Sequence, residues 1–117
     1  MLLKDMAREL DLKLLTPEVS IEETEVSAGY SCDLLSWVLA HGEAGMAWVT
    51  VMTHLNVVAV AMLMEMACVI VPEGIAVEEA SLQKAQEEEI PVFSSDMTAY
   101  ELCGKMYALG IGATHKK

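Results

Sequence analysis

Four short apolar segments recur along the chain, beginning near Val26, Ala47, Cys68 and Pro91, about 21 to 23 residues apart. A polar turn and then a helix-like segment follow each of them. This alternation is typical of βαβ units that build a parallel sheet. We therefore expect an α/β fold with a mainly parallel sheet and helices on both faces. The recurrence is architectural, because no residue pattern repeats with it.

The residues before Val26 predict a short N-terminal helix and strand. Apolar residues from Leu3 to Leu10 recur at helical spacing, which predicts a helix over residues 2–10 and then a strand over residues 12–15. The four strand–helix units are expected at residues 26–30 with 33–40, 47–51 with 55–66, 68–71 with 77–88, and 91–94 with 98–109. We expect one domain over residues 1–113 and a disordered tail over 114–117.

Capping residues mark the expected helix ends. Ser31 or Asp33 is predicted to cap the first of these helices, and Gly42 to end it in a left-handed conformation. Thr53 is the expected cap of the second helix. Thr98 opens a capping-box sequence, Thr-Ala-Tyr-Glu, before the last helix.

Charge excludes several classes of partner. The 117 residues carry a net charge of −11, and no Lys or Arg lies between Lys13 and Lys84. A nucleic-acid-binding protein needs a basic face to neutralise phosphates, so that function is not expected. Binding to anionic membranes is disfavoured for the same reason.

The chain is expected in the reducing cytoplasm. Its N-terminus carries charges where a signal peptide would be apolar, and its longest apolar run, Val57 to Met64, is shorter than the roughly 18 residues that span a membrane. Cys32, Cys68 and Cys103 stand far apart and form no metal-binding motif, so we interpret them as buried thiols.

The second helix has no polar face between Val57 and Met64. Such a helix must be covered on most sides. A homodimer interface is the favoured explanation, and neighbouring helices of the same subunit are the alternative. The expected interface residues are Val57, Val60, Ala61 and Met64.

Polar residues follow each expected strand. Ligands of open parallel sheets bind beyond the carboxyl ends of the strands, so these turns predict a small-ligand site. Its candidate residues are Ser31, Thr53, His54, Asn56, Glu73, Gly74 and Ser95. His54 is either a hydrogen-bond donor or general base for the ligand, or a helix-entry residue bonded to its own turn. Capping alone would also explain the Ser and Thr residues.

Recognisable catalytic motifs are absent from the sequence. It contains no phosphate-binding P-loop, no Gly-x-Ser-x-Gly elbow and no Gly-x-Gly-x-x-Gly fingerprint. No metal or cofactor is predicted, because the spacing of Asp33, Glu73 and Asp96 specifies none. A small enzyme remains an alternative only if Asp33 and Asp96 lie close together. The lack of nearby Lys and Arg disfavours a polyphosphate ligand.

Several segments resemble the DRTGG domain family. They are Trp48 to Ala61, Cys68-Val-Ile-Val-Pro-Glu-Gly, residues 85–95 with Ile-Pro-Val-Phe-Ser-Ser, and Thr-Ala-Tyr-Glu-Leu at residues 98–102. The N-terminal part is similar to the amino-terminal, non-kinase domain of HPr kinase/phosphorylases. The likeness covers residues 2–109. The naming motif Asp-Arg-Thr-Gly-Gly is absent as a string, and its turns align with His54-Leu55 and Glu73-Gly74.

The resemblance implies a small α/β module of larger regulatory or metabolic proteins, found beside CBS domains in regulated pyrophosphatases. Ligand sensing and dimerisation are the roles that it suggests. We therefore expect a non-catalytic regulatory module, a cytoplasmic homodimer that binds a small metabolite or nucleotide. The alternative is a structural interaction module that lends dimerisation to a partner enzyme or kinase.

Overall fold

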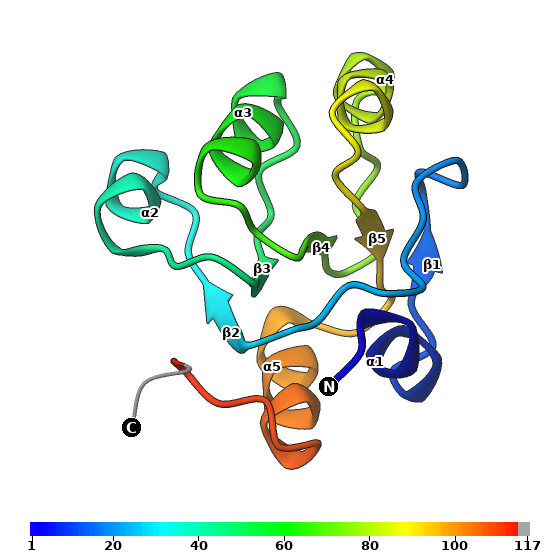
Figure 1. The fold of residues 1–117 in the computed structure, drawn as a ribbon, viewed down its shortest axis with the longest axis vertical. Helices are drawn as coiled ribbons and strands as arrows, with labels where there is room; N and C mark the ends of the chain where they lie inside the picture. The colour runs from blue at the N-terminus through cyan, green and yellow to red at the C-terminus, as the bar shows by residue number, and fades with distance from the viewer. Residues whose placement is uncertain (115–117) are drawn as a thin grey trace.

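The computed structural model describes residues 1–114 as one five-stranded sheet with helices on both faces (Figure 1). The strands are β1 (Lys13–Leu14), β2 (Ala28–Ser31), β3 (Met46–Val49), β4 (Cys68–Val71) and β5 (Val92–Ser94). The helices are α1 (Leu3–Glu9), α2 (Leu35–His41), α3 (Leu55–Leu63), α4 (Glu79–Glu87) and α5 (Ala99–Ala108). The predicted N-terminal helix and strand are thus confirmed.

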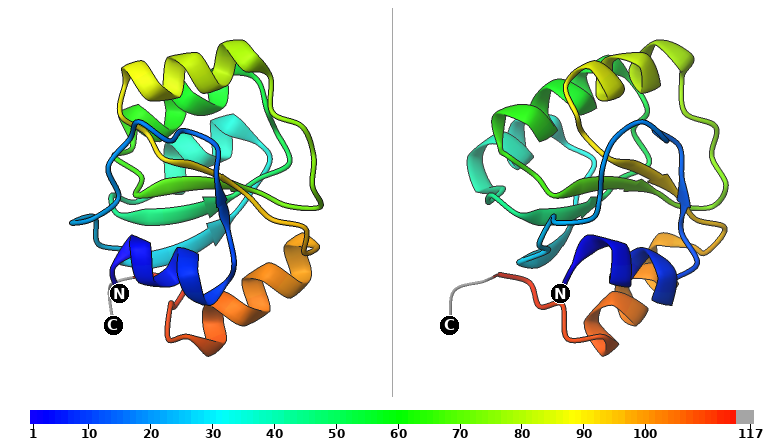
Figure 2. Two further views of the ribbon diagram at one scale, coloured as in Figure 1. Left: turned by 90° about the vertical axis from the view of Figure 1, so that its right-hand side faces the viewer. Right: turned by 45° about the vertical axis from the view of Figure 1, so that its right-hand side comes forward.

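The sheet has the order β1-β5-β4-β3-β2. Strands β2 to β5 are parallel, and β1 pairs antiparallel with β5, so the predicted mainly parallel sheet is confirmed. Each crossover from β2 to β5 moves one strand in the same direction. Because such crossovers are right-handed, α2, α3 and α4 lie on one face (Figures 1 and 2). Helices α1 and α5 cover the other face.

Every residue of β3 and β4 is buried, as expected for central parallel strands covered on both faces. Their alternate side chains enter two separate apolar clusters. One cluster joins Ala47, Val49, Cys68, Ile70 and Phe93 to α1 and α5. The other joins Trp48, Val69, Val71 and Val92 to α2, α3 and α4.

Four helices end in the same way, with a residue in the left-handed conformation just beyond the last turn. At the end of α3, the N–H of Met66 donates to the carbonyl of Ala61 (2.9 Å) and the N–H of Glu65 to that of Met62 (3.1 Å). This pair of bonds is a Schellman motif. The left-handed residues are Asp11 (φ 52°), Glu65 (55°), Glu89 (58°) and Gly110 (96°).

Two predictions for α2 are wrong. Its N-cap is Leu34, and neither Ser31 nor Asp33 caps it, because no side chain bonds to the first turn. Gly42 is extended (φ −66°) and not left-handed. A Cβ at Gly42 would lie 2.8 Å from the carbonyl oxygen of Val38, so close approach to the preceding turn explains the glycine.

The other two capping predictions have opposite outcomes. Thr98 caps α5, since its Oγ1 accepts a hydrogen bond from the N–H of Glu101 (3.1 Å). Thr53 does not cap α3, because His54 takes that position.

Within residues 1–114, no helix has the length and apolar character needed to cross a bilayer. The prediction that the cysteines are buried is right for Cys68, whereas Cys32 and Cys103 are half-buried. Of the predicted tail, residues 115–117 lie outside the described residues. The hydroxyl of Thr114 donates to the carboxylate of Glu43 (3.0 Å).

Candidate functional site

The four turns that carry the predicted ligand residues lie at one edge of the sheet, because β2 to β5 run parallel. Ser31 ends β2, Thr53 and His54 follow β3, Gly74 follows β4 and Ser95 follows β5. Hydrogen bonds hold neighbouring turns together in pairs. The carboxyl edge is therefore an ordered surface, and its hollows decide where a ligand can fit.

His54 is engaged in its own turn. Its Nδ1 accepts a hydrogen bond from the N–H of Asn56 (3.2 Å), which is the capping interaction of α3. The carbonyl of Thr53 accepts a hydrogen bond from the hydroxyl of Ser81 on α4 (2.6 Å). The cavity beside Thr53 and His54 measures only about 10 Å³, too small for more than a single water. The structure thus gives His54 the helix-entry geometry.

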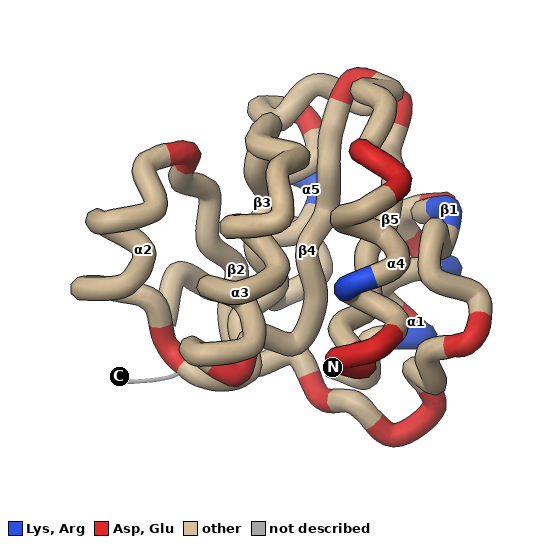
Figure 3. Tube along the Cα trace, turned by 90° about the horizontal axis from the view of Figure 1, so that it is seen from above, with Lys and Arg blue, Asp and Glu red and all other residues tan. Residues whose placement is uncertain are grey.

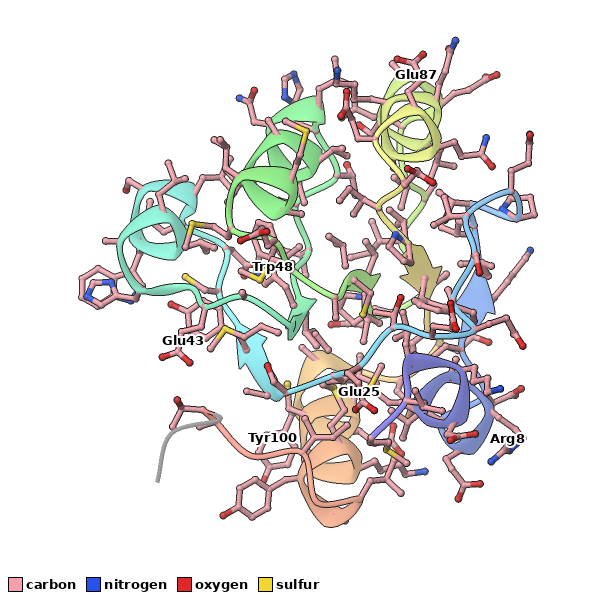
Figure 4. All side chains as sticks on the ribbon, in the orientation of Figure 1. Arg8, Glu25, Glu43, Trp48, Glu87 and Tyr100 are labelled. Carbon is pink, nitrogen blue, oxygen red and sulfur yellow. The ribbon has the colours of Figure 1, made fainter. Side chains whose placement is uncertain are left out.

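Asp33 joins the turns after β2 and β3. Its Oδ1 accepts hydrogen bonds from the hydroxyl of Thr50 (2.8 Å) and from the N–H of Val51 (2.9 Å). The indole of Trp48 lies in the interior (Figure 4) and donates its N–H to the carbonyl of Cys32 (2.8 Å). These contacts hold the two turns in a fixed relative position, so the role of Asp33 is structural.

The turns after β4 and β5 are joined by their backbones. The N–H of Glu73 donates to the carbonyl of Met97 (2.8 Å), and that of Gly74 donates to the carbonyl of Ser95 (2.8 Å). The Ser95 hydroxyl accepts a hydrogen bond from the N–H of Met97 (3.1 Å). A hollow of about 240 Å³ lies beside Ser95, with the carboxylates of Glu9, Asp11 and Asp96 and the ammonium of Lys105 among its lining groups.

A second hollow of about 210 Å³ lies under the sheet edge, between β2, α5 and the segment that follows α5. We name it the β2–α5 groove. Its lining residues are Gly29, Tyr30, Ser31, Cys103, Met106, Tyr107, Ile111, Gly112 and Ala113. Among residues 1–114, no Lys, Arg, His, Asp or Glu lines it. Burial raises the pKa of Tyr30 and that of the Cys103 thiol, so both groups are neutral at physiological pH.

The predicted ligand residues do not converge on one cavity. Ser31 lines the β2–α5 groove, Thr53 and His54 line the 10 Å³ cavity, and Ser95 lines the acidic hollow. Asn56, Glu73 and Gly74 line none of these three hollows. The sequence prediction missed most of the groove, including Tyr107 and the turn at Gly112. The sequence signal that could have indicated the groove is Tyr107, an aromatic residue near the end of an amphipathic helix.

Asp33 and Asp96 are not neighbours. They follow β2 and β5, which are three strand spacings apart, or roughly 14 Å. The two carboxylates are therefore too far apart to share a proton or flank one bond. Within residues 1–114, no group of three or more His, Cys, Asp or Glu side chains is placed to hold a metal ion.

The Lys and Arg residues of the described part of the chain lie away from the middle of the carboxyl edge. Seen from above, α2 and α3 carry neither Lys nor Arg nor acids (Figure 3). Most cations of the described chain contact acids instead, in the pairs Lys4–Glu22, Arg8–Asp5, Lys84–Glu88 and Lys105–Glu101. A polyphosphate at this edge would thus lack the charge that usually binds it.

Helix α3 is covered mainly by its own subunit. Val57, Val60 and Ala61 are buried against the sheet, and Met64 is half-buried. The first three side chains therefore cannot form the surface that a second copy would meet. The exposed apolar side chains of α3 are Leu55, Met62 and Leu63.

The fold and its hollows define a small α/β domain with helices on both faces of the sheet and ligand-sized recesses on its surface. Among solved structures, it is similar to the CBS and DRTGG domains of the regulatory region of Clostridium perfringens pyrophosphatase, determined in complex with the activator diadenosine tetraphosphate. The TM-score is 0.64 at 9% identity, over 87% of this chain and 44% of that one. At this identity the similarity shows a shared fold, and this chain spans less than half the length of that structure. No family model and no curated protein matches the sequence.

Proposed function

We propose that this chain is a non-catalytic regulatory module of the DRTGG type, which binds a small ligand at the carboxyl edge of its sheet. The observation that carries the proposal is the similarity, over 87% of this chain, to a regulatory region that contains a DRTGG domain. The segments quoted for the sequence resemblance support it independently. The separation of Asp33 and Asp96 supports a binding role over an acid–base one.

A thermal-shift screen tests the binding role. Free bases, nucleosides, nucleotides and small phosphorylated metabolites are added to the full chain in turn. A ligand at ten times its Kd stabilises the folded state by about 1.4 kcal/mol, which raises Tm by about 5 °C. The His54→Ala variant, compared with wild type for each hit, shows whether the turn after β3 takes part. If no compound raises Tm, the binding role is wrong.

A homodimer is the second part of the proposal, and a specific surface favours it. Helices α2 and α3 contain no Lys, Arg, Asp or Glu, although the whole chain carries −11. Trp37 on α2 and Leu63 on α3 are 53% and 68% exposed. Two copies that meet through an uncharged face avoid the repulsion that acidic faces would cause. The same surface would serve the alternative role, in which the module binds a partner enzyme or kinase.

Light scattering after size exclusion measures the mass of the species in solution. A homodimer gives about twice the 12.7 kDa of one chain. Leu63→Glu places two new charges in the interface and is expected to give a monomer, whereas Tyr100→Glu on α5 is the matched control at a side chain that is 92% exposed. If the wild-type protein is a monomer at micromolar concentration, the homodimer proposal is wrong and the alternative of a different partner protein is kept.

A further inference from the structure

The outer edge of β2 presents to the β2–α5 groove a pair of backbone groups that have no partner within residues 1–114. Gly29 donates its N–H away from β3, to the carbonyl of Gly112 (2.7 Å). The N–H of Cys32 instead points toward β3 and donates to Val49 (3.3 Å). Because directions alternate along a strand, the carbonyl of Gly29 and the N–H of Ser31 face outward together. No backbone or side-chain group in residues 1–114 bonds to either of them.

An outward carbonyl and the N–H two residues later form an acceptor–donor pair on one edge. The complementary partner is a planar group with an adjacent donor and acceptor, such as an amide or an aminopyrimidine edge. A peptide strand could also pair there, but the edge is too short for one: β2 has four residues, and the segment at Gly112 already takes the N–H of Gly29. One small group therefore fits better than a strand.

The remaining walls of the groove select a neutral ring. No formally charged side chain of the described residues lines it, and burial raises the pKa of both Tyr30 and Cys103. A charged ligand would lose hydration there without gaining a counter-charge. Met106 and Ile111 supply apolar contact, and Tyr107, 73% exposed, offers an aromatic face for stacking. The volume of about 210 Å³ is below that of drug-sized sites and suits a single heterocycle.

We propose that the β2–α5 groove binds a neutral, planar heterocycle of the aminopurine type, held by the carbonyl of Gly29 and the N–H of Ser31 and stacked on Tyr107. This rests on the proposed ligand-binding function and names the chemistry of its ligand. Any phosphate attached to the heterocycle stays outside the groove and contributes little to affinity.

Adenine is the probe, because its amino group and the adjacent ring nitrogen match the carbonyl and N–H pair. Amide chemical shifts of the full ¹⁵N-labelled chain are followed during titration. A fragment of this size is expected to bind with a Kd of about 1 mM. The amides of Tyr30, whose peptide group contains the Gly29 carbonyl, and of Ser31 shift with adenine and with adenosine, whereas N6,N6-dimethyladenine, which lacks the amino donors, leaves them unchanged.

Two pairs of variants separate the contacts. Ser31→Pro removes the outward N–H at an edge position where proline is tolerated, and Ser31→Ala keeps it. Ser31→Pro is expected to weaken the binding of adenine about tenfold, and Ser31→Ala is expected to change its affinity little. Tyr107→Ala weakens binding, whereas the control Tyr100→Ala on the same helix does not. Thermal melts of each variant confirm that it is folded.

The proposal is overturned if adenine leaves the Tyr30 and Ser31 amides unshifted at about 5 mM, several times the expected Kd. It is equally overturned if folded Ser31→Pro binds adenine like wild type. These results differ from a failure of the proposed function. A compound that stabilises the chain but shifts amides elsewhere refutes only the groove, whereas no stabilisation by any compound refutes the binding role as well.

Discussion

Glu65 occupies a backbone conformation that suits glycine. It follows α3 with φ 55°, and its side chain is exposed. The position places a carboxylate beside the carbonyl end of the helix, where negative charge is unfavourable. The equivalent position after α5 is Gly110 (φ 96°). We predict that Glu65→Gly stabilises the protein.

The magnitude follows from three opposing contributions. A residue with a Cβ in the left-handed region costs about 1–2 kcal/mol relative to glycine. Removal of the carboxylate from the helix C-terminus contributes a further gain of about 0.3 kcal/mol. Glycine makes the unfolded chain more flexible, which offsets about 0.7 kcal/mol. The expected net gain in the free energy of unfolding is about 1 kcal/mol, or about 4 °C in Tm.

Urea denaturation followed by tryptophan fluorescence measures the change. Glu65→Gln removes the charge and keeps the strain, so it should recover only the smaller, electrostatic part. Gly110→Ala is the reciprocal control: outside the local backbone, no atom lies within 4 Å of the added Cβ, so its expected loss of about 1 kcal/mol reports backbone strain less the gain from a stiffer unfolded chain. The reasoning is refuted if Glu65→Gly is neutral or destabilising while the m-value stays unchanged.

Three further predictions concern buried or bonded groups. Burial raises the pKa of the Cys68 thiol, so the unfolded chain loses this proton first. Stability is therefore complete below pH roughly 8.5 and falls above it, by up to about 1.4 kcal/mol per pH unit. Cys68→Ala should flatten that slope between urea melts at about pH 8 and pH 10. Asp33→Ala should destabilise by about 2–3 kcal/mol, because it leaves the buried Thr50 hydroxyl without its acceptor. A double-mutant cycle with Thr50→Val checks this, and additive effects would contradict the bond. Thr98→Ala should cost about 1 kcal/mol in the same melts through loss of the α5 cap, and Thr98→Ser should retain most of the stability.

The fold was predictable because its strands are short apolar runs bounded by turn residues. Cys68 to Val71 is predicted to the residue, since Pro72 ends a run that is buried on both faces. The strand order was not predictable from those runs, because any parallel arrangement would bury them equally. The strand order becomes fixed only once each right-handed crossover is known to lead to the adjacent position in the sheet.

Helix ends show where local rules fail. Thr53 and His54 are both residue types that can cap α3; in the structure His54 accepts the capping bond, and the carbonyl of Thr53 accepts a tertiary bond from Ser81 that the local sequence does not encode. The recurring Schellman ends carry a pattern that the sequence does contain: an Ala precedes an acid by four residues and an apolar residue follows the acid. The three cases are residues 7–12, 61–66 and 85–90. The usual rule looks for glycine at the left-handed position after a helix, so it does not detect these ends, where an acidic residue occupies that position.

The sequence correctly placed the polar turns at the carboxyl edge of the sheet. It did not locate the β2–α5 groove. In open α/β sheets the crevice lies where neighbouring connections leave toward opposite faces. Here that point is between β4 and β5, because α4 and α5 lie on opposite faces. Backbone bonds from Glu73 and Gly74 to the turn after β5 close it.

Space is left instead at the end of the sheet where the strand residues are smallest. On the face that α5 covers, β3, β4 and β5 present Val49, Ile70 and Phe93, whereas β2 presents Gly29 and Ser31. A Cβ at Gly29 would lie 3.2 Å from Cε of Met106 and 3.4 Å from Cγ2 of Ile111, so these two side chains fill the space directly over the glycine and the hollow lies beside them. Residue size along one face of the sheet, and not the polarity of the turns, therefore decides where this domain can admit a ligand.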